Sequence, residues 1–255
     1  MTFPRLIGMV HLRPLPGSPS FGGDMASVVA QAQADAMVLA EAGFGGVMVE
    51  NFGDAPFFKD NVPAATVAAM TRAIDAVRRV IDLPIGVNVL RNDGLSALAI
   101  AAVTEANFVR VNVLSSMMFT DQGIIEGRAA EVGRLRTQLC PQVAVLADVY
   151  VKHAVAPEGL TLEQAAIDLW ERSGADGVVV SGTGTGSATN PKDLQRVRAA
   201  IPDAPIFIGS GVTPDSVGML AEWATGFIVG SALKAGPVTD PVDAGLAKAF
   251  VAAAG

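Results

Sequence analysis

The sequence predicts an α/β protein of the (β/α)8 TIM-barrel class, formed as a single domain over residues 1–255, and three observations lead to this. The chain has 255 residues, which is close to the usual size of one such barrel. Eight short apolar runs alternate with alanine-rich amphipathic segments, as parallel βαβ units do. The last two runs each stop at a glycine–serine pair, at the position where these barrels usually bind phosphate, after strands seven and eight.

The expected strands are short apolar runs that end at glycine or at polar residues, which is typical of buried parallel strands. They are 6–10, 46–49, 85–89, 108–113, 143–147, 177–180, 206–208 and 227–229. Helices are expected between them, including 26–41, 64–80, 160–173, 191–200 and 214–223. Gly43 and Gly174 follow two of these helices as C-terminal caps. An open doubly wound sheet is the alternative, but it would not place glycine loops after the last two strands, so the closed barrel is favoured.

The composition narrows the class of protein. The chain is 51% hydrophobic and 17% charged, with a net charge of −7, and it has no Lys/Arg cluster, so no nucleic-acid partner is expected. The single cysteine, Cys140, fits a reducing compartment. The chain shows no signal peptide and no apolar run long enough to span a membrane, so a cytoplasmic protein is expected. A homo-oligomer, with a dimer as the default, is the expected assembly.

A phosphate site is predicted at the two glycine stops, because glycine lets an anion approach backbone N–H groups without a Cβ in the way. The alternative is two tight strand-to-helix turns that need glycine for geometry alone. A third glycine-rich run, 181–186, is expected to form a mobile lid or another phosphate-facing loop. The predicted phosphate-binding residues are Gly209, Ser210, Gly211, Gly230, Ser231 and Gly184.

Polar residues interrupt or follow the expected strands at their C-terminal ends, where barrels of this class carry their active sites. Buried polar groups usually face a ligand, a metal or each other, since burial without a partner is costly. The predicted catalytic residues are Asp148, Glu50, His153 and His11. The predicted substrate-binding residues are Asn88, Arg91, Arg110, Asn112, Lys152 and Ser181.

Alternative roles for these residues stay open. Asp148 and Glu50 would serve as general bases or as ligands of a divalent cation such as Mg²⁺, or would form ion pairs that stabilise the barrel mouth. Whether the protein needs a metal is not determined by the sequence. Arg110 and Asn112 point the same way; inward they would bind a ligand, and outward Arg110 would pack against helices. Schiff-base chemistry is disfavoured, because Lys152 and Lys234 lie beyond strand ends.

Several longer stretches resemble the BtpA/SgcQ family of (β/α)8 proteins over nearly the whole chain. The resemblance implies the ribulose-phosphate-binding barrel superfamily, in which one cyanobacterial member is tied to photosystem I biogenesis and others to sugar uptake and catabolism. The matching stretches are 8–12, 14–19, 50–52, 88–93, 108–113, 121–127, 147–149, 151–154 and 230–231. The chain departs from the family after Lys234, where members often carry a longer, more polar segment.

Together these observations lead to a cytosolic enzyme that acts on a phosphorylated sugar or a nucleotide-derived pentose phosphate. Isomerisation, aldol-type cleavage and hydrolysis all use such groups, so the reaction type stays open. The alternative is a non-catalytic assembly factor for a membrane complex. If Asp148 acts directly in catalysis, Asp148→Asn should abolish turnover and leave thermal unfolding nearly unchanged.

Overall fold

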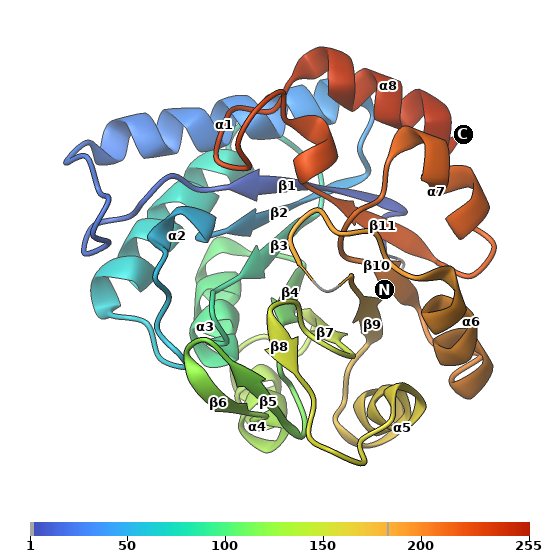
Figure 1. The fold of residues 1–255 in the computed structure, drawn as a ribbon. Helices are drawn as coiled ribbons and strands as arrows, with labels where there is room; N and C mark the ends of the chain where they lie inside the picture. Colours follow the sequence, from blue (N-terminus) through green and yellow to red (C-terminus); the bar gives the residue numbers. More distant parts are fainter. Residues whose placement is uncertain (1–2, 183) are drawn as a thin grey trace.

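The computed structural model describes residues 3–182 and 184–255, which form a closed barrel of eight parallel strands surrounded by helices (Figure 1). The order of strands around the barrel is β1-β11-β10-β9-β7-β4-β3-β2. The closed barrel is confirmed, and the open sheet is excluded. The barrel strands are β1 (Leu6–His11), β2 (Gly46–Glu50), β3 (Ile85–Asn88), β4 (Phe108–Val111), β7 (Ala144–Asp148), β9 (Gly177–Val180), β10 (Ile206–Ile208) and β11 (Gly226–Val229).

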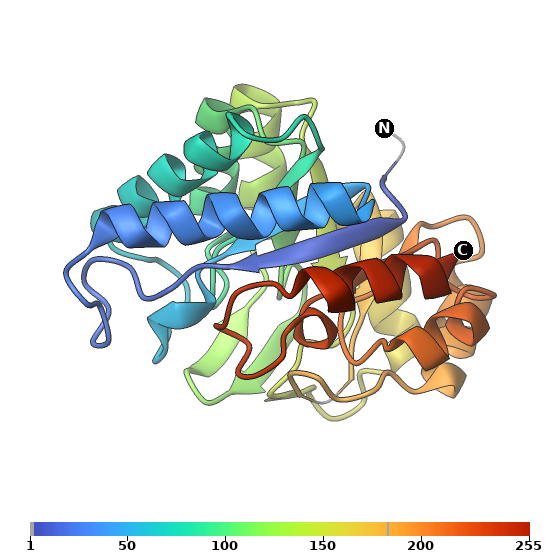
Figure 2. The same cartoon turned by 90° about the horizontal axis from the view of Figure 1, so that it is seen from above.

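A helix follows each barrel strand, and the first helix packs against the last on the outside of β1, which closes the ring (Figure 2). The expected helix at 160–173 is divided, because its last turn, Asp168–Arg172, has π-helical hydrogen bonding. The helices are α1 (Met25–Ala42), α2 (Ala64–Arg78), α3 (Gly94–Thr104), α4 (Ala129–Leu139), α5 (Leu162–Ile167), α6 (Pro191–Ala200), α7 (Pro214–Leu220) and α8 (Ala244–Ala254). Single 3₁₀ turns lie at Phe52–Asp54 and Ser231–Leu233.

The closed end of the barrel is filled by large apolar side chains from alternate strand positions. Phe108 and Phe207 are fully buried there, and Phe3 packs edge-on against them, with ring centroids 6.3 and 5.3 Å away. Gly86 and Gly226 leave room for these rings, since a Cβ on either glycine would overlap a phenylalanine ring. The packed end fixes the direction in which the next inward-facing residue of each strand points.

A small antiparallel sheet was not expected from the sequence. It is made of β5 (Met117–Thr120), β6 (Gly123–Glu126) and β8 (Ala154–Val155), in the order β6-β5-β8. One face buries Met118 and Ile125. The other face exposes a row of directly paired residues, which we call the apolar row: Phe119 (45% exposed), Ile124 (47%) and Val155 (68%). The turn between β5 and β6 reaches the barrel mouth.

We predict that Gly86→Ala lowers the free energy of unfolding by about 1–3 kcal/mol, because the added methyl group overpacks against Phe108. Gly133→Ala is the matched control. Gly133 lies inside α4 with open space where a Cβ would stand, so alanine there should raise stability by about 0.5–1 kcal/mol. Urea unfolding followed by circular dichroism measures both; equal stability of the two variants would contradict this account of the core.

Candidate functional site

The barrel mouth carries charged and polar side chains at inward-facing positions, two residues beyond the apolar layer on each strand. His11 pairs in register with Glu50, Glu50 with Asn88, and Asn88 with Arg110, so that one level of the barrel is polar across four neighbouring strands. All four side chains are buried. The sequence placed these residues at strand ends, and strand pairing brings them side by side.

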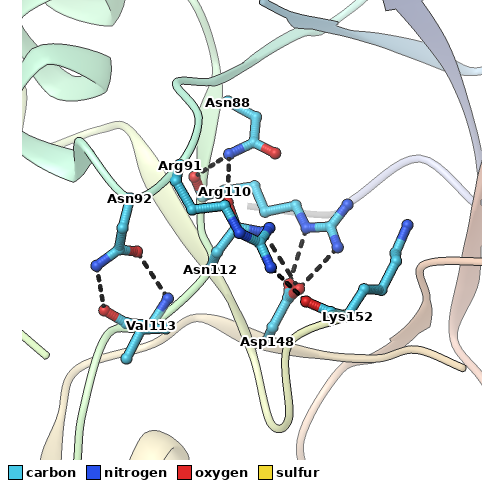
Figure 3. Close-up of polar contacts among 8 residues, drawn as sticks. All are labelled: Asn88, Arg91, Asn92, Arg110, Asn112, Val113, Asp148 and Lys152. Atoms are coloured by element: carbon cyan, nitrogen blue, oxygen red, sulfur yellow. Dashed lines mark hydrogen bonds and ion pairs between the residues drawn. The ribbon is translucent and has the colours of Figure 1, made fainter. Parts of the chain in front are cut away.

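Arg110 of this level forms a buried ion pair with Asp148 at the end of β7 (Figure 3). The Nε and Nη2 atoms of Arg110 donate to the two carboxylate oxygens of Asp148, each at 2.8 Å. Asn112 donates to the same carboxylate at 3.3 Å, and Asn88 donates to the Asn112 side-chain oxygen at 3.0 Å. Arg110 and Asn112 therefore point inward, which decides the alternative that the sequence left open.

Two glycines at the mouth make room for charged or aromatic side chains. A Cβ on Gly209 would lie 3.2 Å from Nη2 of Arg110 and 2.5 Å from the Val179 side chain. A Cβ on Gly230 would lie 2.9 Å from Cε1 of His11. A larger residue at either position would therefore collide with its neighbours, which explains the glycines in addition to their predicted role of exposing backbone N–H groups.

Short polar side chains hold the loops of the mouth in place. Asn51 accepts from the Leu90 backbone N–H at 2.7 Å, and Asp54 accepts from that of Leu15, also at 2.7 Å. Asn92 exchanges two hydrogen bonds with the backbone of Val113, at 2.7 and 3.0 Å. The sequence analysis assigned these three residues no role; the available signals were their position after strand ends and, for Asn51 and Asn92, the family resemblance of stretches 50–52 and 88–93.

A cavity of about 390 Å³ opens at the mouth, between the β5–β6 turn and the loops that follow β2, β3 and β7. Its walls combine apolar side chains with three cationic ones. The lining residues are Glu50, Phe52, Phe57, Leu90, Arg91, Arg110, Asn112, Asp121, Gln122, Val151, Lys152, His153 and Thr185.

A second, smaller cavity of about 40 Å³ adjoins the first and is bounded by both glycine loops. The two cavities share the side chains of Glu50, Phe52, Arg110, Lys152 and Thr185. The predicted phosphate residues that line it are Gly209, Ser210, Gly211, Gly230 and Ser231, joined by the predicted catalytic residue His11.

Burial changes the proton affinity of three groups at the boundary between the cavities. Burial raises the pKa of Glu50, so its carboxyl group holds a proton more readily than an exposed one. Burial, helped by the charge of Arg110, lowers the pKa of Lys152 to about 8. Burial also lowers the pKa of His11 to about 3, so its ring is neutral at pH 7 and its 3.7 Å contact with Glu50 is not an ion pair.

The structure brings most of the predicted site residues to the two cavities. Glu50, Arg91, Arg110, Asn112, Lys152 and His153 line the larger one. Four predicted residues lie outside both linings. Asn88 is hydrogen-bonded to Asn112, Asp148 is paired with Arg110, and Ser181 faces Gly209. Gly184 lies against the His153 ring, and its neighbour Gly186 lines the small cavity instead; residue 183 of this run is outside the described residues.

His153 stands at the rim and is exposed. Its Nε2 atom lies 3.2 Å from the Thr185 hydroxyl and 3.3 Å from the Thr185 backbone nitrogen. The sequence analysis did not assign Phe52, Phe57, Asp121, Gln122 or Thr185 to the site. The stretches 50–52 and 121–127 were part of the family resemblance, which was the only signal for Phe52, Asp121 and Gln122, and no sequence signal pointed to Phe57.

No group of three or more His, Cys, Asp or Glu side chains within residues 3–182 and 184–255 is arranged to hold a metal ion. Asp148, one of the two expected ligands, already binds Arg110 through both oxygens. A divalent cation therefore stays a prediction; Glu50 is the expected ligand that remains at the cavities. In the same described part of the chain, no helix is long and apolar enough to cross a membrane.

Comparison with known proteins decides the family. The model of the BtpA family matches residues 3–255. The chain belongs to the BtpA family. It is 47% identical over 249 residues to the photosystem I biogenesis protein BtpA of Synechocystis, covering 97% of this chain and 87% of that protein. An uncharacterized protein of Thermococcus kodakarensis is 50% identical over 231 residues, which cover 90% of this chain and 86% of that one.

Among solved structures, a tryptophan synthase from M. tuberculosis superposes on this BtpA-family chain with a TM-score of 0.63 at 18% identity. The match covers 99% of this chain and 93% of the other. At this identity the likeness shows the shared barrel fold. The expected resemblance to the BtpA/SgcQ family and the TIM-barrel class are both confirmed.

For this BtpA-family protein, we predict that Asp148→Asn lowers the free energy of unfolding by about 3–5 kcal/mol, because it leaves the buried Arg110 guanidinium without its counter-charge. This replaces the expectation of unchanged unfolding, which applied to a carboxylate facing the substrate. Asp75→Asn is the control: it breaks an exposed ion pair with Arg79 and should cost less than about 1 kcal/mol. Similar losses in urea unfolding for both variants would contradict the structural role.

The proton affinity of Lys152 can be tested without a known substrate. Limited acetylation at increasing pH, followed by mass spectrometry, should give a midpoint of about 8 for Lys152. The negative charge of Glu50 raises the pKa of Lys152 and the positive charge of Arg91 lowers it. Glu50→Gln should therefore move the midpoint down and Arg91→Met should move it up. A midpoint near about 10.4 in the wild type, as for a free lysine, would show that the amine is not perturbed.

Proposed function

We propose that this BtpA-family barrel is an enzyme that acts on a phosphorylated sugar or a nucleotide-derived pentose phosphate by proton transfer. One observation carries the proposal: a small cavity between two glycine loops adjoins a larger cavity, and Glu50 and Lys152 stand in the wall that the two share. A phosphate group in the small cavity would place the carbon chain beside both of these groups.

The small cavity suits a phosphate group in its chemistry. The backbone of the loops at 209–211 and 230–231 borders this cavity. The N–H group of Gly209 already donates to the Val180 carbonyl, so the N–H groups of Ser210, Gly211 and Ser231 are the ones that we propose to meet the phosphate. Arg110 and Lys152 also line this cavity and supply positive charge. Ser231 adds a hydroxyl group that can donate to a phosphate oxygen.

Glu50 and Lys152 suit acid–base catalysis because burial moves their pKa values in opposite directions, toward neutral pH. The raised pKa makes the Glu50 carboxyl group easier to protonate, which suits a general acid, and the lowered pKa makes the Lys152 amine easier to deprotonate, which suits a general base. Perturbed pKa values in a cavity are a common mark of catalytic groups. In this proposal Asp148 orients Arg110 through their ion pair, and His153 contacts the substrate from the rim.

Phosphate binding is the first test. We expect inorganic phosphate to raise the midpoint of thermal unfolding of the wild type, since a ligand that binds the native state stabilises it. Ser231→Asp should abolish this shift, because it places a carboxylate in the small cavity, and Ser231→Ala should weaken it. Ser20→Asp, at an exposed loop position outside both cavities, is the control for the added charge. The absence of a phosphate shift in the wild type would refute the proposal.

The second candidate is a non-catalytic assembly factor, and two observations favour it. The Synechocystis relative is a photosystem I biogenesis protein. The apolar row of Phe119, Ile124 and Val155 is exposed and offers a surface to a protein partner. An assembly factor of this kind does not need an anion at the glycine loops. If Phe119→Ser abolishes the protein's function in the cell while Glu50→Gln leaves that function intact, the assembly factor is favoured over the enzyme.

A further inference from the structure

Arg91 is a buried cation in the wall of the larger cavity that the proposed proton transfer does not use. It follows β3, and its side chain is 8% exposed. One of its nitrogen atoms, Nη2, donates to the backbone carbonyl of Lys152, which fixes the guanidinium group (Figure 3). The remaining N–H groups have no hydrogen-bond acceptor among residues 3–182 and 184–255. Arginine presents several donors in a planar fork, so the anchored group keeps donors for a ligand.

The charges around Arg91 do not balance. None of the ion pairs formed within the described residues includes Arg91. Asp148 is the carboxylate with the largest effect on it, but both oxygens of Asp148 are already engaged by Arg110. Asp121, at the β5–β6 turn, also borders the cavity and is exposed.

The walls of the larger cavity carry three cationic side chains, Arg91, Arg110 and Lys152, and two carboxyl groups, Glu50 and Asp121. The charge of Arg110 is compensated by Asp148, which lies outside the lining. Burial favours the neutral form of Glu50, which leaves Asp121 as the other carboxyl group of the lining to face Arg91 and Lys152. This positive centre lies in a chain whose net charge is −7, so the charge is local and not a property of the whole surface.

Arg91 lines the larger cavity and is not among the residues of the small one. An anion bound by Arg91 therefore lies apart from the phosphate that we place between the glycine loops. A carboxylate or a phosphate accepts two parallel hydrogen bonds from a guanidinium fork, which favours either group over a hydroxyl.

We propose that the substrate carries a second anionic group, a carboxylate or a second phosphate, which binds Arg91 at the end of the larger cavity away from the glycine loops. This inference rests on the proposed function, because it takes the first phosphate to occupy the small cavity. The substrate class is then a sugar acid phosphate or a sugar bisphosphate.

Thermal-shift titration with matched pairs of compounds tests whether the substrate carries a second anionic group. 6-Phosphogluconate and sorbitol 6-phosphate differ in a terminal carboxylate against a terminal hydroxymethyl group. Ribulose 1,5-bisphosphate and ribulose 5-phosphate differ in the second phosphate. We expect the wild type to bind at least one compound with two anionic groups about tenfold more tightly than its partner with one. The pair that shows the preference identifies the second group as carboxylate or phosphate.

The variants connect this preference to Arg91. Arg91→Met should reduce the tenfold preference to about twofold or less, and Arg91→Lys should retain part of it, since it keeps the charge and loses the fork. Arg134→Met, on the exposed surface of α4, removes the same charge and should leave the preference intact. Inorganic phosphate should stabilise all four proteins, because the small cavity is unchanged.

The outcomes separate the two proposals. If inorganic phosphate stabilises the wild type but neither compound with two anionic groups binds more tightly than its partner, the second anionic group is refuted and the phosphate site stands. If the preference persists in Arg91→Met, the assignment to Arg91 is refuted. If inorganic phosphate itself has no effect, the proposed function fails, and the inference fails with it.

Discussion

The buried ion pair between Arg110 and Asp148 is the interaction on which the barrel mouth depends. Two unit charges in an apolar barrel are costly unless each satisfies the other, and here both oxygens of the carboxylate are engaged. The pair spans neighbouring strands β4 and β7, so its geometry follows from the barrel itself. Because Arg110 is fixed, it can stand in the wall of both cavities and contribute charge to each.

Inward-facing glycines have opposite effects at the two ends of the barrel. At the closed end, Gly86 and Gly226 make room for phenylalanine rings, and the space is filled. At the mouth, Gly209 and Gly230 make room for Arg110 and His11, and the space above remains open as the small cavity. Glycine thus allows close packing at the closed end of the barrel, which supports the strands. At the mouth it borders an open cavity that is available to a ligand.

The pKa shifts at the barrel mouth are caused by desolvation more than by ion pairing. Burial is the largest cause of the shifted pKa values of Glu50, Lys152 and His11, and it acts on all three because they share one partly closed space. An acidic chain thereby keeps two cations in the cavity wall, Arg91 and Lys152, outside the ion pairs formed among the described residues. This combination supports the proposed binding and proton transfer of small anions.

The sequence by itself determined the barrel, its eight strands and the polar strand ends, because buried parallel strands must be apolar runs and their ends are where polar residues become tolerable. It did not predict the β5–β6–β8 sheet, whose strands of two to four residues are too short to show a periodicity. Only the tertiary structure decided that Asp148 faces Arg110, that Lys152 is desolvated and that Arg91 is left without a carboxylate partner among the described residues. Those outcomes depend on which strands pair and in which register, and residues such as Arg110 and Asp148, 38 positions apart, carry no local mark of their contact.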